Sequence, residues 1–315
     1  MTGGRVRVHR AARGFTLVEA IVAIVLTAII AGTMVLFIKR PVANYIDSAG
    51  RAEMSDVADL ALRRMAREIR ASLPNSARAQ FTASDGAWYL EFIPTFGGGR
   101  YLSVEDNTVS GTPLSFTDPA AASFSVVGAA AAMTPAGPNY IAIYNLGAGF
   151  QDADAYAAGN LARVTGSSMA SGLQTIAYAS VAAADLGGGN TVSPVANPFA
   201  APANAATPRP PNTSPDQRFQ VVGKPVVFRC AGNASGTGTL TRSVAPVFSP
   251  VPTTPAAGAG VLLANNVVAC ALSVAGNANR QSALVGLTLT LGRTGSDGRL
   301  ETVTLTHQIN VNNLP

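Results

Sequence analysis

A single carboxylate, Glu19, stands inside the most apolar segment of the chain. Residues 15–38 read FTLVEAIVAIVLTAIIAGTMVLFI, and Glu19 is the only charged residue among them. A charged acid inside a membrane costs roughly 2.5–3.5 kcal/mol on insertion scales, so it needs a partner there. A cut between Gly14 and Phe15 would supply one, because the new α-amino group of Phe15 would lie four residues before Glu19.

Residues that could carry out catalysis are few. One of the two histidines, His9, belongs to the basic leader, and His307 lies in VTLTHQINV, an alternating pattern typical of a structural strand residue. Asp152 and Asp154 could begin a calcium loop, but further oxygen ligands at regular spacing are missing, so we interpret QDADAY as a polar turn. No nucleophile elbow, phosphate loop or Cys–His arrangement occurs in the sequence. We therefore expect no enzyme activity, no catalytic residue, no metal and no cofactor.

The apolar run is long enough to cross a membrane. A helix of 24 residues covers about 36 Å, against a hydrocarbon core of ~30 Å. A cleaved secretory signal would have a shorter apolar region of about 7–15 residues. Four arginines precede the run, and only Lys39 and Arg40 follow it directly. The positive-inside rule therefore predicts a single pass through the bacterial inner membrane, with a cytoplasmic N-terminus and a periplasmic body.

The overall charge says little about partners. The chain has 315 residues, of which 12 % are charged and 48 % apolar, so an intrinsically disordered chain is excluded. The formal charge of +5 comes largely from four arginines in the first 14 residues, which leave 18 basic against 17 acidic residues in the body. A nearly neutral body gives no reason to expect nucleic-acid binding.

The segment RGFTLVE, residues 13–19, resembles the processing site of type IV prepilins and type II secretion pseudopilins. The resemblance covers the basic leader, the Gly–Phe step, the spacing of the Glu and the long apolar helix. It implies that a membrane prepilin peptidase and methyltransferase cleaves after Gly14 and methylates the amino group of Phe15. It also implies that Glu19 pairs with an amine when subunits dock. Many relatives have a proline within the apolar half, whereas the first proline here is Pro41.

Beyond the membrane segment, the helical pattern continues. Apolar residues recur at three- and four-residue steps from Met54 to Leu73, which predicts an amphipathic helix packed on a sheet. Five acidic and five basic residues lie between Asp47 and Arg70, so we interpret the arginine run as a solvated or salt-bridged face. We expect a leader at 1–14, a membrane and fibre-core helix at 15–40, and its outer half at 41–73.

Residues 74–315 are predicted to form a β-rich periplasmic head, which makes the fold α+β and pilin-like. Gly97–Gly99 has no strand–helix context and is expected to be a turn. Residues 186–217 contain a Pro/Ala/Gly-rich stretch that is typical of a long surface loop. Strands are predicted at 88–93, 101–104, 124–127, 140–144, 173–179, 218–229, 239–247, 261–274, 283–291 and 301–311.

Cys230 and Cys270 are the only cysteines. In a head outside the cytoplasm, a disulfide is the default state of such a pair. The bond would close a loop of about 40 residues and contribute roughly 4 kcal/mol in the chain-entropy model. Two buried free thiols remain an alternative, whereas a four-ligand zinc site is disfavoured because no histidine lies nearby.

The helix at 38–76 and the segments at 214–230, 261–270, 283–291 and 303–315 are similar to biogenesis proteins of MSHA-type pili. This similarity implies a non-enzymatic minor subunit that takes part in pilus assembly or priming. The head of about 240 residues is bulky for a subunit repeated throughout a thin fibre. Alternatives are a J-type minor pseudopilin of a type II secretion system and a pilus-tip adhesion subunit. The implied partners are the peptidase, other major and minor pilins, the inner-membrane assembly platform and the lipid bilayer.

Overall fold

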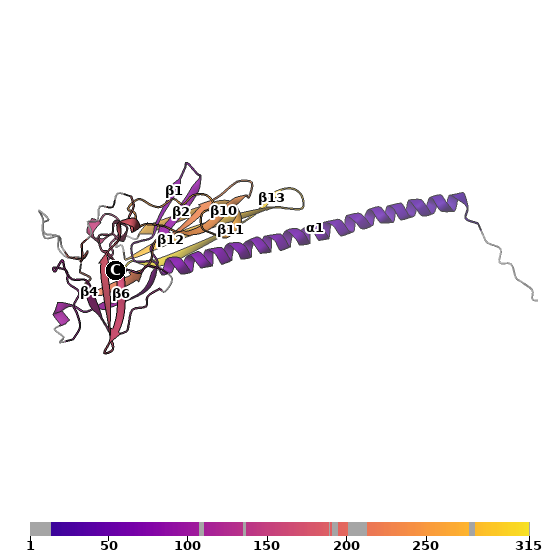
Figure 1. Cartoon of the computed structure of the whole chain (residues 1–315). Coiled ribbons are helices and arrows are strands. Elements are labelled where there is room, and N and C mark those ends of the chain that lie inside the picture. The colour runs from indigo at the N-terminus through magenta and orange to yellow at the C-terminus, as the bar shows by residue number, and fades with distance from the viewer. Residues whose placement is uncertain are drawn as a thin grey trace, which may run out of the picture.

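The computed structural model describes residues 14–106, 110–134, 137–188, 190, 195–200, 213–276 and 281–314. Figure 1 shows a single long helix that extends from one side of a β-rich head. The strands of the head form a seven-stranded sheet and a closed barrel. The predicted α+β class, with a long N-terminal helix packed on antiparallel sheets, is confirmed. The leader residues 1–13 and most of the predicted loop at 186–217 lie outside the described residues.

The helix α1 (Leu17–Arg70) contains 54 residues and is therefore about 80 Å long. It continues through Pro41, although a proline removes one backbone hydrogen bond and commonly bends a helix. Its C-terminal end is capped by Ala71, whose N–H donates to the carbonyl groups of Glu68 and Ile69. The helical pattern had predicted an end near Leu73, three residues later.

The sheet that faces α1 is antiparallel throughout. Its strand order is β1-β2-β9-β10-β11-β12-β13, and β1 and β13 are the two edges. Strands β12 and β13 form the longest pairing, in unbroken register over 13 residue pairs. The strands are β1 (Arg78–Thr82), β2 (Ala87–Phe92), β9 (Val226–Ala231), β10 (Gly238–Val244), β11 (Val261–Gly276), β12 (Ser282–Thr294) and β13 (Leu300–Asn312).

The outer half of α1 and this sheet share one apolar core. The predicted stripe on the helix is buried, with Met65 and Ile69 fully covered and Met54 only 5 % exposed. Alternate residues of the strands, such as Leu287 and Leu289 on β12, face the same core. Each large side chain buried in this way contributes roughly 1.5–3 kcal/mol, so the sheet fixes the outer half of the helix firmly.

A second unit, a closed barrel, is inserted in sequence between β2 and β9 of the sheet. Its order is β3-β4-β7-β6-β5-β8, and β8 pairs with β3 to close it. Its core is aromatic: the Phe124 ring lies 5.1 Å from Phe219 and 6.0 Å from Tyr178. Its strands are β3 (Thr95–Tyr101), β4 (Ser123–Val127), β5 (Tyr140–Ala142), β6 (Leu161–Ala170), β7 (Leu173–Ser180) and β8 (Arg218–Val222).

Three local predictions for this region were wrong. Gly97–Gly99 is not a turn but the middle of β3. At Gly98 a Cβ would lie 2.7 Å from the carbonyl oxygen of Phe219, so the glycine permits β3 to approach β8 closely. The strand predicted at 101–104 ends at Tyr101, and the segment predicted as one strand at 218–229 is divided between β8 and β9.

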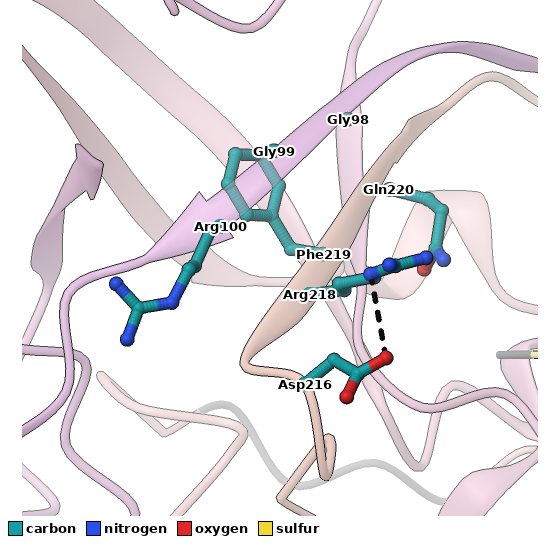
Figure 2. A pocket seen from close by; sticks show the side chains of 7 residues that line it. All are labelled: Gly98, Gly99, Arg100, Asp216, Arg218, Phe219 and Gln220. Carbon is teal, nitrogen blue, oxygen red and sulfur yellow. Dashed lines mark ion pairs between the residues drawn. The ribbon is translucent and has the colours of Figure 1, made fainter. Parts of the chain in front are cut away.

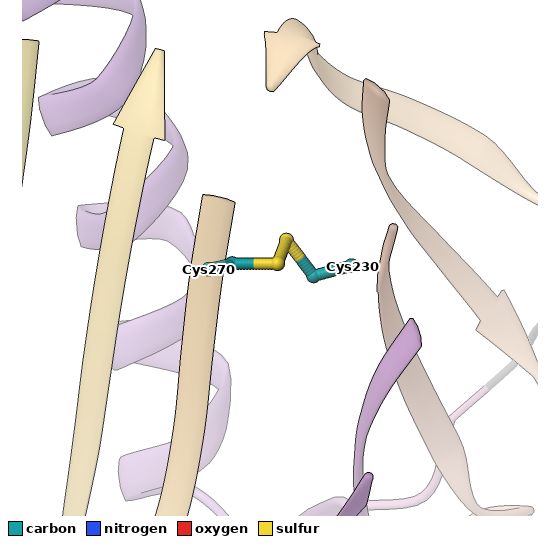
Figure 3. The surroundings of a disulfide bond; sticks show 2 residues. All are labelled: Cys230 and Cys270. Atoms are coloured by element: carbon teal, nitrogen blue, oxygen red, sulfur yellow. A yellow bond between two sulfur atoms is a disulfide. The ribbon is translucent and has the colours of Figure 1, made fainter. Parts of the chain in front are cut away.

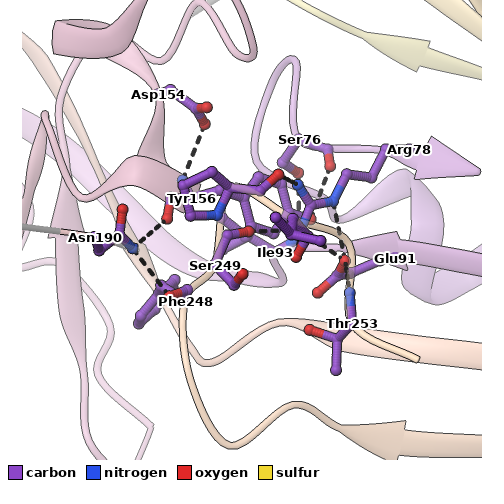
Figure 4. A network of polar contacts seen from close by, with 12 residues as sticks. Ser76, Arg78, Glu91, Ile93, Asp154, Tyr156, Asn190, Phe248, Ser249 and Thr253 are labelled. Atoms are coloured by element: carbon purple, nitrogen blue, oxygen red, sulfur yellow. Dashed lines mark hydrogen bonds and ion pairs between the residues drawn. The ribbon is translucent and has the colours of Figure 1, made fainter. Parts of the chain in front are cut away.

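Arg78 joins the sheet to the barrel side of the head (Figure 4). Its guanidinium lies 3.6 Å from the centre of the Tyr156 ring, in the short 3-10 helix Ala155–Ala157. It also forms an ion pair at 2.7 Å with Glu91 on β2, whose side chain is 2 % exposed. A third contact is a hydrogen bond of 2.8 Å to the carbonyl oxygen of Ser249. One half-buried cation thus contacts β2, the 3-10 helix at Tyr156 and the loop at Ser249.

Candidate functional site

The start of α1 places the predicted cleavage residues in an accessible position. Thr16 is the N-cap, and its hydroxyl oxygen accepts a hydrogen bond of 3.3 Å from the backbone N–H of Glu19. The bond between Gly14 and Phe15 therefore precedes the helix. Phe15 is 74 % exposed, and no atom lies within 4 Å of the Cβ position at Gly14. A protease could reach this peptide bond without unfolding the helix.

Glu19 lies in the first helical turn, where a negative charge complements the positive end of the helix dipole. Its position four residues from Phe15 corresponds to one turn of helix. Thr16 and Glu19 also match the Thr-x-x-Glu pattern of a capping box. The sequence at this point therefore begins the helix at a defined residue and places an acidic residue in its first turn.

The inner half of α1, residues 17–46, exposes every large apolar side chain whose burial the structure describes. It belongs to the one described helix that is long and apolar enough to cross a membrane. Phe37 is 80 % exposed, which for an apolar side chain in water is unfavourable. The exposed side chains are Leu17, Val18, Ile21, Val22, Ile24, Val25, Leu26, Ile29, Ile30, Met34, Val35, Phe37, Ile38, Val42, Tyr45 and Ile46.

The hairpin between β12 and β13 holds α1 where it leaves the head. The Ser296 hydroxyl and backbone N–H donate hydrogen bonds of 2.6 and 2.9 Å to the Asp47 carboxylate. These bonds hold the pKa of Asp47 below its ordinary value. The Arg293 guanidinium occupies the space where a Cβ at residue 50 would be, so the buried Gly50 admits it. We call Asp47, Gly50, Arg293 and Ser296 the helix clamp.

Ion pairs continue along the outer half of α1. Asp59 accepts from Arg63 at 2.6 Å and lies 3.7 Å from the Nε2 atom of His307 on β13. Glu68 pairs with Arg242 on β10 at 2.6 Å. Arg63 and Arg64 of the arginine run thus form ion pairs, which agrees with the interpretation of a solvated or salt-bridged face. His307 is a strand residue that faces the helix. His9 lies outside the described residues.

Cys230 and Cys270 are joined in a disulfide, as predicted. Figure 3 shows the bond between β9 and β11, with the helix behind β11. The two Cα atoms are 6.4 Å apart, although β10 lies between these strands in the sheet order. The bond thus ties a central strand to the part of β11 that extends past β10. These are the only two cysteines in the sequence, so neither is left as a free thiol.

The two aspartates considered for calcium have a structural role. Asp154 is 6 % exposed and accepts a hydrogen bond of 3.0 Å from the backbone N–H of Tyr156. Burial raises the pKa of this carboxyl above its ordinary value. Among the described residues, no three His, Cys, Asp or Glu side chains lie close enough to hold a metal. The interpretation of this segment as a polar turn agrees with the fold, which contains two 3-10 helices here.

The head has an open hollow of about 510 Å³ between β3 and β8 (Figure 2). Its exposed charges are two arginines and one aspartate, and Asp216 lies 3.6 Å from the Nε atom of Arg218. Asp216 is the one carboxylate that lines it, and its ion-pair partner is the exposed Arg218. The residues that line the hollow are Gly98, Gly99, Arg100, Asp216, Arg218, Phe219 and Gln220.

Residues 9–35 match the family model described as the prokaryotic N-terminal methylation motif. The chain carries the N-methylation motif of type IV prepilin-like proteins. This motif implies processing by a prepilin peptidase and assembly with other pilin-like subunits, which are structural proteins and not enzymes. Together with the exposed apolar helix, it indicates a membrane-anchored, pilin-like protein. Neither a curated protein nor a solved structure matches the chain.

The motif residues of this prepilin-like chain are evident from local sequence, whereas the helix clamp is not. A signal for the clamp was present: Gly50 lies inside a helical pattern, where glycine is unfavourable by about 1 kcal/mol relative to alanine. Such a glycine indicates a close approach by another part of the chain. The partners, Arg293 and Ser296, are more than 240 residues away, so only the fold could identify them.

Proposed function

We propose that this chain is a minor pilin-like subunit, cleaved after Gly14 and methylated on the amino group of Phe15. The observation that carries the proposal is the inner half of α1, which exposes sixteen large apolar side chains within and just beyond a matched N-methylation motif. Such a surface requires either lipid or other helices around it. A subunit that is first stored in a membrane and then packed into a fibre core satisfies both conditions in turn.

In the membrane stage, the four arginines of the leader favour a cytoplasmic N-terminus and a periplasmic head. The cut before Phe15 removes these charges and creates an α-amino group. A charge-assisted contact between that amine and Glu19, within one chain or between neighbours, offsets the cost of an acid in an apolar environment. Docking thus depends on cleavage, because the uncut chain has no amine at this position.

The finer assignment is an MSHA-type pilus, with a role in assembly or priming. It is supported by the resemblance to the MSHA pilus biogenesis protein MshO, which covers the helix and the last hundred residues. The bulk of the head supports a low copy number. A J-type minor pseudopilin of a type II secretion system would share the same helix, and the genes beside this one in the genome would separate the two assignments.

The test is the intact mass of the protein purified from its native membranes. We expect the mass of a chain that begins at Phe15 and carries one added methyl group. Gly14→Val should leave the leader attached, because the peptidase accommodates a residue without a side chain before the cut. Gly32→Val is the matched control: no atom lies within 4 Å of its Cβ position, and it should be processed normally. An uncut wild-type chain, or a cut elsewhere, would contradict the proposal.

A further inference from the structure

Strand β13 is an edge strand with an open side. It pairs with β12 over its whole length, and within the described part of the chain no strand pairs with its other side. Its sequence, LETVTLTHQINVN, contains no proline, lysine or arginine, and its pairing shows no bulge. Prolines, positively charged side chains and bulges are among the features by which edge strands ordinarily avoid pairing with other chains, and β13 has none of these three. A row of backbone N–H and C=O groups is therefore available to an extended segment.

The opposite edge of the same sheet is different. Strand β1 has only five residues, against 13 in β13. It also begins with Arg78, whose side chain is engaged with the loop before β11. A short edge beside a charged residue offers few backbone groups for strand addition. Of the two outer strands, β1 is thus protected and β13 is open, while the end of β11 past Val267 is a shorter stretch that pairs with β12 alone.

The side chains around the open edge restrict what can bind there. The outward residues of β13 are exposed and uncharged. Thr288 and Thr290 beside them on β12 are half-buried and also uncharged. Thr290 lies 2.8 Å from Thr304 and Thr288 lies 3.2 Å from Thr306, oxygen to oxygen, so these hydroxyls are paired with each other. A binding segment would meet a neutral surface of methyl and hydroxyl groups, which favours an uncharged strand of alternating pattern.

The position of β13 indicates where the occupant comes from. Glu301 and His307 on this strand face Arg51 and Asp59 on α1, at 2.8 and 3.7 Å. The open edge therefore runs beside the helix that, in the proposed function, packs against neighbouring subunits. Antiparallel pairing of two β13 strands about a two-fold axis would point the two helices in opposite directions. Two copies joined in this way could not share one membrane orientation.

We propose that the open edge of β13 takes up an extended segment from the head of a different pilin-like subunit, by strand addition. The inference rests on the proposed function, because it assumes that a neighbour docks along α1. Backbone hydrogen bonds supply the affinity, and the neutral outward side chains select an uncharged partner strand. The edge then connects the heads of two subunits, while the helices connect their cores.

One test uses lysines beside the edge in the full-length chain, expressed in its native host. Thr304→Lys together with Thr306→Lys should lower incorporation into fibres by about tenfold or more, because exposed lysines oppose strand addition. The matched control is Ala269→Lys with Ala271→Lys, which places the same charges on exposed positions of the same sheet face, two strands away from β13 on the end of β11 that pairs with β12 alone. The control should assemble like the wild type, and normal cleavage of both variants shows that they reach the membrane.

A second measurement does not depend on the lysine variants being stable. A photo-crosslinking residue at Gln308 on β13 is compared with one at Ser273 on β11, in the same row of paired residues. We expect Gln308, and not Ser273, to crosslink to a head peptide of another pilin-like subunit, identified by mass spectrometry. Equal crosslinking from both positions, crosslinking only to a second copy of this chain, or normal assembly of the Thr304/Thr306 variant would overturn the inference. A wild-type chain that is neither cleaved nor assembled would instead overturn the proposed function.

Discussion

Residues 17–46 and residues 47–70 belong to one continuous helix, yet they meet opposite surroundings. In the outer half, Met65 and Ile69 are fully buried against the sheet. In the inner half, residues of the same chemical kind are exposed, such as Ile24 at 67 % and Leu17 at 76 %. The outer half satisfies its apolar face within its own chain, whereas the inner half can do so only in a membrane or against other subunits.

The two halves of the helix therefore contribute to different free energies: the outer half to folding of the head, and the inner half to membrane storage and assembly. Substitutions in the outer half should change the stability of the folded head. Substitutions in the inner half should leave that stability unchanged and act on membrane storage or assembly. The helix clamp at Asp47 and Gly50 marks the boundary between the two regimes.

The largest effect is expected from Glu19→Ala. The variant should insert in the membrane and be cleaved, since the cut lies four residues away and an apolar residue is cheaper in lipid. Incorporation into fibres should nevertheless be lost, because the amine of Phe15 has no carboxylate to meet. Mature subunit retained in the membrane, with few subunits in sheared fibres, is the expected result.

The matched control for Glu19→Ala is Glu53→Ala. The Glu53 carboxylate is 77 % exposed and lies 4.0 Å from Arg293, so its removal should barely affect assembly or stability. Wild-type incorporation of the Glu19 variant would show that docking does not use this carboxylate. If cleavage were still essential in that case, the chain would belong at the first position of the fibre, where no earlier neighbour exists.

The next effect concerns the sheet beneath the outer half. Replacing Cys230 and Cys270 together by serine should lower the free energy of unfolding of the head by about 4 kcal/mol, since the bond closes a loop of 40 residues. Thermal unfolding of the detergent-solubilised chain measures this loss. Membrane insertion and cleavage should be unchanged. Both thiols reacting freely in unreduced, denatured wild-type protein would contradict the disulfide itself.

A smaller effect compares one residue from each half. Met65→Ala removes a fully buried side chain from the shared core and should cost about 2–5 kcal/mol. Ile24→Ala, in the exposed inner half, should change the stability of the head by less than about 0.5 kcal/mol. Urea unfolding in detergent, followed by the fluorescence of Trp88 on β2, gives both values. Equal losses would mean that the inner half also packs against the head.

The sequence predicted much of this arrangement because local signals were strong. The motif around Gly14 and Glu19, the apolar run and the helical stripe are patterns within a few turns of one helix. The long strands β11, β12 and β13 also alternate clearly and were found close to their observed limits.

The barrel was harder to predict because its signals depend on distant contacts. The glycines of β3 look like a turn, but they are required by the close approach of Phe219, more than 100 residues later. Strand β6 was missed because six consecutive residues of it are exposed, so it lacks the alternation of a half-buried strand. The contacts of Arg78 and the helix clamp were missed for the same reason, since in each a charged residue contacts segments that are distant in sequence.

The smallest effect tests the boundary itself, the bond between Asp47 and Ser296. Because the two hydrogen bonds from Ser296 lower the pKa of Asp47, the carboxylate contributes stability that is complete at pH values above its ordinary pKa of 3.8. That contribution is lost as the pH falls through the lowered pKa, where protonation removes the charge that accepts both bonds. The backbone N–H signal of Ser296, observed by NMR in selectively labelled full-length protein, should therefore shift with a midpoint below 3.8. Asp47→Asn should abolish this shift, whereas Asp297→Asn, which removes the neighbouring carboxylate, should preserve it. A midpoint at or above 3.8, or a shift that follows Asp297, would mean that the hairpin does not hold the helix at this point and that the boundary between the two halves lies further along α1.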